Sequence, residues 1–388
     1  MKKIVSIYDF LKELGGLERM KFFHANKLKE KFDIQLLYGF VSEKEKENIV
    51  RELELKEEIK ISQIGKMKNE ILQLGLFFLF PKRINKLKTD MVISYSFMAS
   101  RIAYKKKKKD KTPYLIIICH PPNFLYPSVK GWVNNPSRFF AKLLNLGYGK
   151  ILRKLDEKYV QNADKVISIS EYTKKRVKEL YGVNSEVVYP QLSGFFKQIS
   201  SKEKKLFLKK KKIKNKFMLA HGRIIPDKNY KILLDIMEDF ENIDLIISGG
   251  ISEKYRKTLE NKVRLNGLQK RVRILGRISR GDLLRYYNCA ELFLLPAKKE
   301  DFGLTPIEAM ACGTPVIAWG DNAGPNETVQ DGINGLLVKP YDLEDFAEKV
   351  KRGIIKKWDK KKIVESVRKF SEEEVWKSFY NIIRNIDM

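Results

Sequence analysis

The sequence predicts an α/β protein with two consecutive Rossmann-like domains, each built on a doubly wound parallel sheet. Two observations lead to this fold class. Short apolar runs of the kind that form buried parallel strands recur along the 388 residues, and helical patterns separate most of them. The series is interrupted once, near the middle, and then starts again, which indicates two α/β domains in succession.

The first half predicts an N-terminal domain over residues 1–200. Gly15 and Gly16 form a turn that opens its first helix, which should run to about residue 31. Ser170 is a good N-cap for a basic helix that Gly182 should end. Strands are expected at residues 3–8, 32–38, 91–95, 114–119, 165–169 and 186–189.

The second half predicts a C-terminal domain over residues 213–370. Serine, glycine and a lysine run break the pattern before it, so the domain linker is expected at residues 201–212. Open α/β sheets bind ligands beyond the carboxyl ends of their strands, which makes the cleft between the domains the expected site. Strands are expected at residues 217–221, 244–248, 272–275, 292–295, 316–318 and 335–338.

The net charge of +29 is concentrated in the first half of the chain. Residues 1–212 contain 46 lysines and arginines against 22 aspartates and glutamates, a net charge of +24. Nucleic acid, anionic lipid headgroups or an acidic acceptor would all be attracted to such a charge. The alternative explanation for this charge is a genome that is rich in lysine codons. Such a bias would add lysine to both halves of the chain alike, so we favour a functional role for the charge of the first half.

One apolar segment leaves two interpretations open. Residues 71–80 are too few for a membrane-spanning helix, which needs about 20 apolar residues. Because a basic flank follows it, this segment could lie in a membrane interface. It could also be a helix of the protein core, and we favour the core helix. The basic residues of the flank are Lys82, Arg83, Lys86 and Lys88.

Cysteine usage and the N-terminus favour a cytoplasmic protein. Cys119, Cys289 and Cys312 are scattered without paired spacing, which indicates a reducing compartment and neither a disulfide framework nor a zinc site. The first residues turn polar too quickly for a signal peptide and predict a strand. With the basic first half, this predicts a cytoplasmic protein that associates peripherally with a membrane.

Two glutamates, Glu300 and Glu308, surround a glycine-containing turn that opens a helix. Backbone N–H groups at a helix N-terminus bind phosphate, and carboxylates beside them accept hydrogen bonds from hydroxyls, so the stretch suits a phosphorylated sugar. A capping box is the purely structural alternative, with Thr305 at N-cap, Pro306 at N1 and Glu308 at N3. That alternative leaves Glu300 without a role.

A basic pair follows the strand expected at residues 217–221. Gly222 permits a turn there, and Arg223 and Lys228 can converge on a diphosphate at the strand's carboxyl end. Taken alone, such a pair is more often solvated surface. No Asp-x-Asp motif in a strand-end context suggests a metal site, so we expect no metal and no other cofactor.

These motifs together resemble retaining glycosyltransferases of family 4, which have the GT-B fold of two Rossmann-like domains facing a deep cleft. The Gly-Pro-Asn-Glu-Thr turn at residues 324–328 and the Asp-Gly-Ile-Asn-Gly turn at residues 331–335 add to the resemblance, which covers essentially the whole chain. Gly15 and Gly16 look like the family's N-terminal glycine loop. Residues 119–122 look like the segment that holds its active-site histidine, His120.

The resemblance implies a nucleotide-sugar site. Arg223 and Lys228 would bind the nucleotide diphosphate and stabilise the leaving group, Glu308 would hold the ribose hydroxyls, and Glu300 would contact the sugar near its anomeric carbon. His120 would lie near the transferred sugar, although a strand-end histidine without catalytic role is the alternative. Further contacts would come from Gly16, Gly222, Arg277, Ile278, Phe302, Gly303, Leu304 and Thr305, and the helix at residues 371–388 would pack back on the N-terminal domain.

The implied activity is transfer of a hexose from a nucleotide sugar to a glycan or lipid-linked acceptor, in the synthesis of cell-surface polysaccharide, glycolipid or glycoprotein glycans. Residues 119–126 look closest to mannosyltransferase members, so GDP-mannose is favoured over UDP-glucose. The loop around Gly249 and Gly250 departs from the family pattern and leaves the base and sugar open. Rival hypotheses are a UDP-glucose or UDP-N-acetylglucosamine transferase, and a nucleotide-sugar epimerase or hydrolase. Nucleic-acid binding would leave Glu300, Glu308 and Arg223 unexplained, so we expect no nucleic-acid partner.

Overall fold

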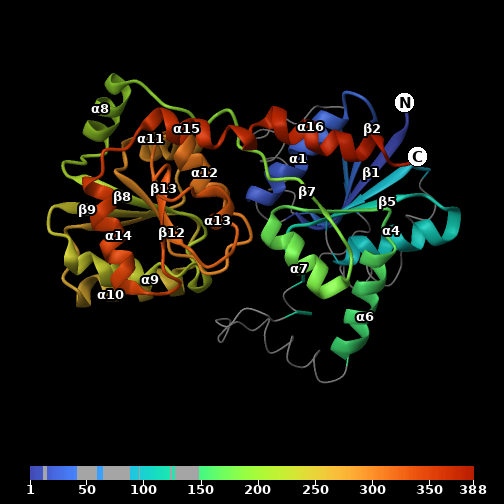
Figure 1. Cartoon of the computed structure of the whole chain (residues 1–388), viewed down its shortest axis with the longest axis horizontal. Helices are drawn as coiled ribbons and strands as arrows, with labels where there is room; N and C mark the ends of the chain where they lie inside the picture. The colour runs from blue at the N-terminus through green and yellow to red at the C-terminus, as the bar shows by residue number, and fades with distance from the viewer. Residues whose placement is uncertain (12–14, 42–58, 64–87, 96, 123–124, 127–147) are drawn as a thin grey trace. The chain divides into compact units, whose positions relative to one another are not determined.

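The computed structural model describes residues 1–11, 15–41, 59–63, 88–95, 97–122, 125–126 and 148–388. These residues form two compact units, one of Met1–Pro190 with Val375–Met388 and the other of Gln191–Glu374 (Figure 1). Each unit contains one sheet in which every pair of neighbouring strands is parallel, with helices around it. The predicted α/β class with two doubly wound sheets is therefore confirmed.

The sheet of the N-terminal unit has seven strands in the order β3-β2-β1-β4-β5-β6-β7. The chain adds β2 and β3 on one side of β1 and then crosses to the other side, so the switch point lies between β1 and β4. The strands are β1 (Lys3–Leu11), β2 (Asp33–Val41), β3 (Lys60–Gln63), β4 (Met91–Ser94), β5 (Tyr114–Ile118), β6 (Lys165–Ser168) and β7 (Glu186–Val187).

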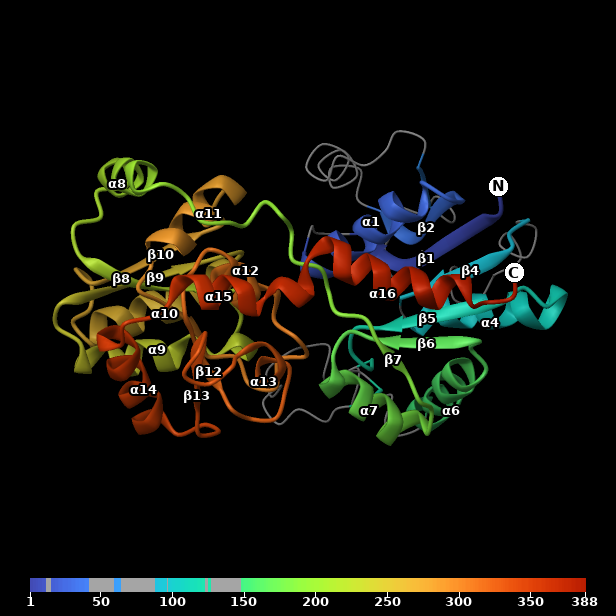
Figure 2. The ribbon, with the colours of Figure 1, turned by 45° about the horizontal axis from the view of Figure 1, so that its top comes forward.

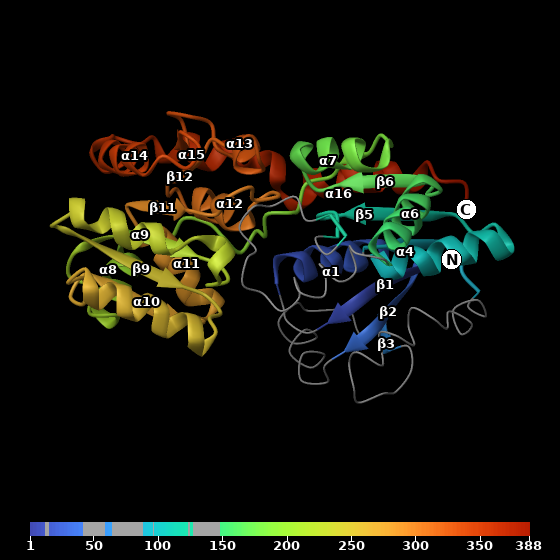
Figure 3. The ribbon, with the colours of Figure 1, turned by 90° about the horizontal axis from the view of Figure 1, so that it is seen from below.

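Among the described residues, five helices belong wholly or mainly to this unit. Three of them pack against one face of the sheet, and α4 and α6 lie side by side (Figure 3). Ser170 caps α7 by accepting a hydrogen bond from Thr173 N, and Gly182 ends it with a left-handed φ of 69°, so both predictions are confirmed. The helices are α1 (Gly16–Leu28), α4 (Phe97–Asp110), α6 (Tyr148–Gln161), α7 (Glu171–Tyr181) and α16 (Glu372–Arg384).

The C-terminal helix α16 lies beside α1 (Figure 1). The His24 ring of α1 stacks on the Phe379 ring of α16, with ring centroids 3.9 Å apart and an interplanar angle of 13°. His24 is buried, and burial lowers its pKa to about 3, so the ring is neutral and packs as an aromatic side chain. The two ends of the chain also meet, because Lys2 Nζ donates a hydrogen bond to the carbonyl of Met388.

The sheet of the C-terminal unit has six strands in the order β10-β9-β8-β11-β12-β13. The chain adds β9 and β10 on one side of β8 and β11 to β13 on the other, which puts the switch point between β8 and β11. The strands are β8 (Lys216–His221), β9 (Ile243–Ser248), β10 (Val272–Gly276), β11 (Leu292–Leu295), β12 (Val316–Trp319) and β13 (Gly335–Val338).

Side chains alternate between the two faces of β8. Met218 and Ala220 belong to the core cluster that includes α9, α10 and α14, whereas Phe217 and His221 contact α11 on the opposite face. Figure 2 shows α9 and α14 on one side of the sheet and α11 and α12 on the other. The helices are α8 (Ser201–Lys210), η2 (Pro226–Lys228), α9 (Lys231–Ile236), η3 (Met237–Asp239), α10 (Glu253–Leu265), α11 (Arg280–Cys289), α12 (Leu304–Ala311), α13 (Pro325–Thr328), α14 (Leu343–Ile355), α15 (Lys360–Ser366) and η4 (Arg368–Phe370).

The linker expected at residues 201–212 is mostly the helix α8, so this prediction is wrong. Ser200 caps the helix by accepting a hydrogen bond from Glu203 N, and Phe207 is buried edge-on against Tyr286, with ring centroids 4.9 Å apart. The buried Phe207, together with the ion pair of 3.0 Å between Glu203 and Arg285 of α11, fixes this basic helix on the surface, while its lysines at residues 202, 205, 209 and 210 stay exposed. The chain changes units at Pro190, ten residues before the expected end of the N-terminal domain.

Two other sequence predictions have different outcomes. The first helix ends at Leu28 and not near residue 31. Residues 71–80 and most of their basic flank lie outside the described residues, so the choice between core and membrane interface stays open. No helix in the described part of the chain is long and apolar enough to span a membrane.

A buried carboxyl group joins two helices of the N-terminal unit. Asp156 of α6 is 2% exposed, and its Oδ2 accepts a hydrogen bond of 2.8 Å from the hydroxyl of Tyr181 on α7. Burial raises the pKa of Asp156 to about 7, from an ordinary value of 3.8, because the charged form loses its hydration.

This carboxyl group should make stability depend on pH. Between about pH 4 and pH 7 the folded protein holds a proton on Asp156 that the unfolded chain has released, so stability falls as pH rises through this range. Asp156→Asn should remove the effect and be more stable than the wild type at pH 8, by roughly 2–4 kcal/mol. Thermal unfolding of both proteins at pH 5 and pH 8 measures this. Parallel pH profiles would contradict it.

Candidate functional site

The predicted site residues of the C-terminal unit gather at the carboxyl edge of its sheet, around the switch point between β8 and β11. Open α/β sheets bind their ligands at this place. Gly222, Arg223 and Lys228 follow β8, while Glu300 and the start of α12 follow β11. The other predicted residues here are Arg277 and Ile278 after β10, and Phe302, Gly303, Leu304, Thr305 and Glu308 after β11.

An ion pair joins the loops that follow β8 and β11. Lys228 Nζ donates to Glu300 Oε2, and the two side chains are 25% and 19% exposed. Partial burial reduces screening by water, so this pair is stronger than an ordinary surface pair. A ligand phosphate that binds Lys228 must therefore compete with, or share the cation with, Glu300.

The turn after β12 holds the backbone around Glu300. Lys299 has a left-handed φ of 49°, and its N–H donates a hydrogen bond of 2.8 Å to Asp321 Oδ2. The Tyr341 hydroxyl donates to the same oxygen at 3.1 Å, and Gly324 N donates to the Glu300 carbonyl at 2.8 Å. These three bonds hold a conformation that a lysine rarely adopts alone.

The capping box predicted for Thr305, Pro306 and Glu308 is wrong. Gly303 is the N-cap, with a left-handed φ of 87°, so the helix begins at Leu304. Pro306 becomes the third helical residue, a position where a missing N–H breaks no bond within the helix. Glu308 lies beyond the capping position, and its Oε2 accepts a hydrogen bond of 2.9 Å from the Tyr287 hydroxyl.

Glycines bring the backbones after β8, β9 and β10 into contact. Gly222 N donates to Ser248 O at 3.1 Å, and Gly249 N donates to Gly276 O at 2.7 Å. Gly249 has φ of 139°, and a Cβ on it would lie 1.6 Å from the Gly222 carbonyl oxygen. Only glycine fits such an approach, which explains the glycine loop seen in the sequence.

The two arginines of the site differ in their surroundings. Arg223 is exposed, and its side chain forms no hydrogen bond or ion pair with the residues that the structure describes. Arg277 is also exposed, and its guanidinium passes 3.2 Å from where a Cβ on Gly250 would lie. Its side chain thus runs over the loop that follows β9.

Two predicted residues belong to the N-terminal unit, at the carboxyl edge of its own sheet. Gly16 is the first residue of α1, and the preceding Gly15 N donates a hydrogen bond of 3.1 Å to Glu18 Oε2. His120 follows β5 and is exposed, with Nδ1 3.2 Å from the carbonyl oxygen of Pro121.

Sequence reasoning missed three residues that support the site. Asp321 lies at the carboxyl edge, two residues after β12, so its position in the sequence could have identified it. Tyr287 has no such signal, since it lies inside a helix. His221 received no role, yet its Nδ1 lies 2.8 Å from Ser248 Oγ. Burial lowers the pKa of His221 to about 4, so the ring is neutral near pH 7.

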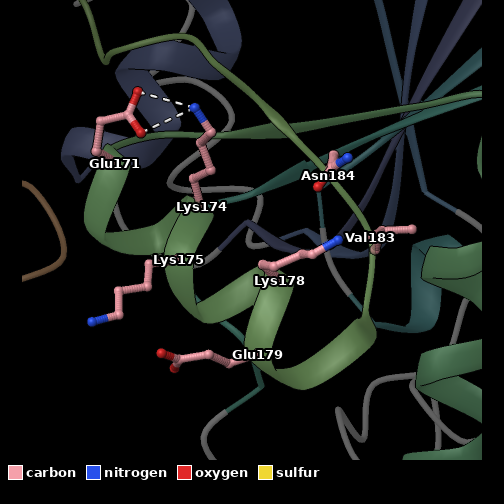
Figure 4. Close-up of a pocket in the computed structure, with 7 residues that line it drawn as sticks. All are labelled: Glu171, Lys174, Lys175, Lys178, Glu179, Val183 and Asn184. Atoms are coloured by element: carbon pink, nitrogen blue, oxygen red, sulfur yellow. Dashed lines mark hydrogen bonds and ion pairs between the residues drawn. The ribbon is translucent and has the colours of Figure 1, made fainter.

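A hollow on the surface of α7 is not this site. An ion pair of 3.1 Å between Lys174 and Glu171 crosses it, and none of the predicted site residues lines it (Figure 4). Solvated lysines and glutamates on one helix face are ordinary surface. The lining residues are Glu171, Lys174, Lys175, Lys178, Glu179, Val183 and Asn184.

The two units match two family models. Residues 14–190 match the model of glycosyltransferase family 4, and residues 201–370 match the model of group 1 glycosyl transferases. Together the models cover most of the chain, one for each unit. The chain belongs to glycosyltransferase family 4, as its motifs predicted.

Relatives by sequence include several glycosyltransferases. An uncharacterised glycosyltransferase of Methanocaldococcus jannaschii is 30% identical over 58% of this chain and 59% of its own length. A D-inositol 3-phosphate glycosyltransferase of Mycobacterium sp. is 38% identical over 33% of this chain and 30% of its own. The mannosylfructose-phosphate synthase of Agrobacterium fabrum is 27% identical over 48% and 44%. The match thus spans between about a third and three fifths of these relatives.

The solved structures confirm the GT-B fold. HepE of Anabaena, crystallised with UDP and glucose, matches with a TM-score of 0.78 over 100% of both chains, at 19% sequence identity. At this level of identity the likeness concerns the fold.

The contact between Gly249 and Gly222 predicts that position 249 has no space for even the methyl side chain of alanine. Gly249→Ala should lower the thermal midpoint of the C-terminal unit by several degrees, because the new Cβ would overlap the Gly222 carbonyl and the backbone conformation disfavours an L-residue. Gly194→Ala is the matched control, since its Cβ would have no neighbour within 4 Å. Calorimetry that gives equal midpoints for both variants would refute the close approach.

Proposed function

We propose that the protein is a retaining hexosyltransferase. It moves a sugar from a nucleotide diphosphate sugar to a glycan or lipid-linked acceptor. The observation that carries this proposal is the Lys228–Glu300 pair at the switch point of the C-terminal sheet. It sets a cation for the diphosphate beside a carboxylate for the sugar hydroxyls, as a nucleotide sugar requires.

The donor would bind along the carboxyl edge of this sheet. Lys228 and Arg223 would hold the diphosphate and stabilise its charge as it leaves, while Glu300 would accept hydrogen bonds from the sugar. The first N–H groups of α12, around Leu304, would add donors that point out of the helix end. Glu308 would take the ribose hydroxyls.

Other predicted residues would surround the donor. The backbone at Arg277 and Ile278 would meet the nucleobase, and the Phe302–Thr305 backbone would complete the sugar and phosphate pocket. Gly16 would let the N-terminal glycine loop approach the diphosphate. His120, exposed after β5, would lie near the transferred sugar on the acceptor side.

The proposed reaction retains the anomeric configuration. The bond between the anomeric carbon and the diphosphate oxygen breaks, and the acceptor oxygen forms a new bond on the same face. The proton of the acceptor hydroxyl passes to a leaving phosphate oxygen. Lys228 and Arg223 would balance the charge of the leaving diphosphate, so the proposal includes transfer without a metal ion, and unchanged rates in EDTA would support it.

Mannose from GDP-mannose is the favoured donor sugar. The resemblance of residues 119–126 to mannosyltransferases supports this choice, as does the similarity to the Agrobacterium synthase. UDP-glucose is the alternative, and the UDP and glucose bound to Anabaena HepE favour it. Transfer rates with GDP-mannose, UDP-glucose and UDP-N-acetylglucosamine distinguish the donors, and the proposal expects the highest rate with GDP-mannose.

Glu300→Ala tests the function. Transfer should fall by about 100-fold or more, because the transition state loses a contact at the reacting sugar. The affinity for the free nucleoside diphosphate should stay within about threefold of wild type, or rise slightly, since Lys228 loses its competing carboxylate. Transfer assays and calorimetric titration measure the two quantities.

Glu291 provides a matched control for Glu300. It precedes β11, and its carboxylate pairs at 3.6 Å with Lys216, which begins β8. The same two strands thus carry one ion pair at the amino edge and one at the carboxyl edge. Glu291→Ala should leave transfer unchanged. Full transfer by Glu300→Ala, or equal losses in both variants, would contradict the assignment.

Peripheral association with an anionic membrane is part of the proposal, with a cytoplasmic protein acting on a membrane-borne acceptor. The first turns of α6 support it: Ile151 is 58% exposed between the exposed Lys150 and Lys154. An apolar side chain flanked by lysines suits the interface of a bilayer that carries negative headgroups.

Charge reversal on α6 tests the membrane association. Lys150→Glu with Lys154→Glu should weaken binding to vesicles that contain anionic lipid by roughly 30-fold or more, because each lysine near the surface contributes about 1 kcal/mol and each new glutamate is repelled. Lys202→Glu with Lys205→Glu, both exposed on α8 of the other unit, makes the same charge change as a control. Sedimentation with vesicles measures both. Equal binding by the two double variants would exclude α6 as the contact.

A further inference from the structure

Tyr287 is a buried tyrosine whose hydroxyl points to a proposed ligand-binding carboxylate. It lies on α11, is fully buried, and donates a hydrogen bond of 2.9 Å to Glu308 Oε2. Glu308 itself is only partly buried. One atom of this carboxylate is therefore tied to the interior, while the group remains partly accessible.

The ring of Tyr287 is fixed on several sides. It packs edge-to-face against Phe293, Phe196 and His221, with ring centroids 5.6, 5.7 and 6.2 Å apart. The Thr314 hydroxyl donates to its backbone carbonyl. A ring enclosed in this way has one position for its hydroxyl. The hydroxyl that donates the hydrogen bond to Glu308 is therefore held in place before any ligand binds.

The hydroxyl also has a fixed protonation state. Burial raises the pKa of Tyr287 well above its ordinary value, and the negative charge of Glu308 raises it further. The phenol therefore stays protonated and donates to the ionised carboxylate, which makes a charge-assisted hydrogen bond.

We infer that Tyr287 is a positioning residue that fixes the Glu308 carboxylate for binding the ribose hydroxyls of the donor. This rests on the proposed function, in which Glu308 holds the ribose. Two neighbouring hydroxyls need a carboxylate in one orientation, and a glutamate that rotates freely must lose that freedom on binding. Tyr287 removes the freedom in advance.

A purely structural role is the rival interpretation, because any buried hydroxyl needs a partner. The two roles differ in what they change. A structural role affects stability alone, whereas a positioning role affects how strongly the protein prefers a ribose that carries its hydroxyls.

The test compares Tyr287→Phe with Tyr286→Phe. Both residues are buried on α11, and Phe keeps the packing of either ring, but the Tyr286 ring packs on Phe207 and Phe217, away from Glu308. Calorimetric titration gives the affinities for GDP and 2′,3′-dideoxy-GDP, and for UDP and 2′,3′-dideoxy-UDP. Of the two pairs, the one whose ribonucleotide binds more tightly to the wild type is used. The ribose preference is the affinity for that ribonucleotide divided by the affinity for its dideoxy form.

Tyr287→Phe should reduce the ribose preference at least fivefold while binding the dideoxy nucleotide with wild-type affinity, and Tyr286→Phe should keep the full preference. Wild-type preference in Tyr287→Phe, or an equal loss in both variants, overturns the inference. Glu308→Ala separates the two proposals. If it keeps the ribose preference, or if the wild type has none, the ribose role of Glu308 fails as well. If Glu308→Ala loses the preference and Tyr287→Phe keeps it, only the inference about Tyr287 fails.

Discussion

The ion pair between Lys228 and Glu300 is the interaction on which the rest of the site depends. It joins the ends of β8 and β11, the two neighbouring strands where the C-terminal sheet reverses its winding. At such a place two loops diverge and leave room for a ligand. The two loops carry one charge of each sign in direct contact, and each charge stabilises the other.

Close main-chain contacts and one buried carboxylate hold the loops that carry these two charges. On one side, the Gly222 carbonyl lies against Gly249 with no space for a Cβ. On the other, a Cβ on Gly324 would lie 2.4 Å from Phe302 Cα, while Asp321 holds the left-handed Lys299. Close packing of main chains allows little adjustment, so the charged side chains start from fixed positions.

The parts of the fold that depend on local sequence were predictable. The strands at residues 292–295 and 335–338 have the observed bounds, because short apolar runs that are buried on both faces leave little choice of ends. Helix α8 was mistaken for a linker, since its lysine run hides a single buried Phe207. The start of α12 was misplaced by two residues, because the left-handed conformation of Gly303 depends on its surroundings.

The site was predictable as a set of residues but not as a set of contacts. Strand-end position identified Lys228, and the turn that opens a helix identified Glu300 and Glu308. Their partners depend on which strands become neighbours. Nothing in the sequence joins Lys228 to Glu300 across 72 residues, or Tyr287 to Glu308 from inside another helix. Such contacts follow from the order of the strands and the register of the helices.

A crystal structure with a bound nucleotide diphosphate sugar tests the central claim most directly. The account predicts that a diphosphate oxygen lies within about 3 Å of Lys228 Nζ, a normal charge-assisted hydrogen bond, with the Glu300 carboxylate against a sugar hydroxyl. A donor bound elsewhere, with the pair between Lys228 and Glu300 intact and untouched, would contradict it.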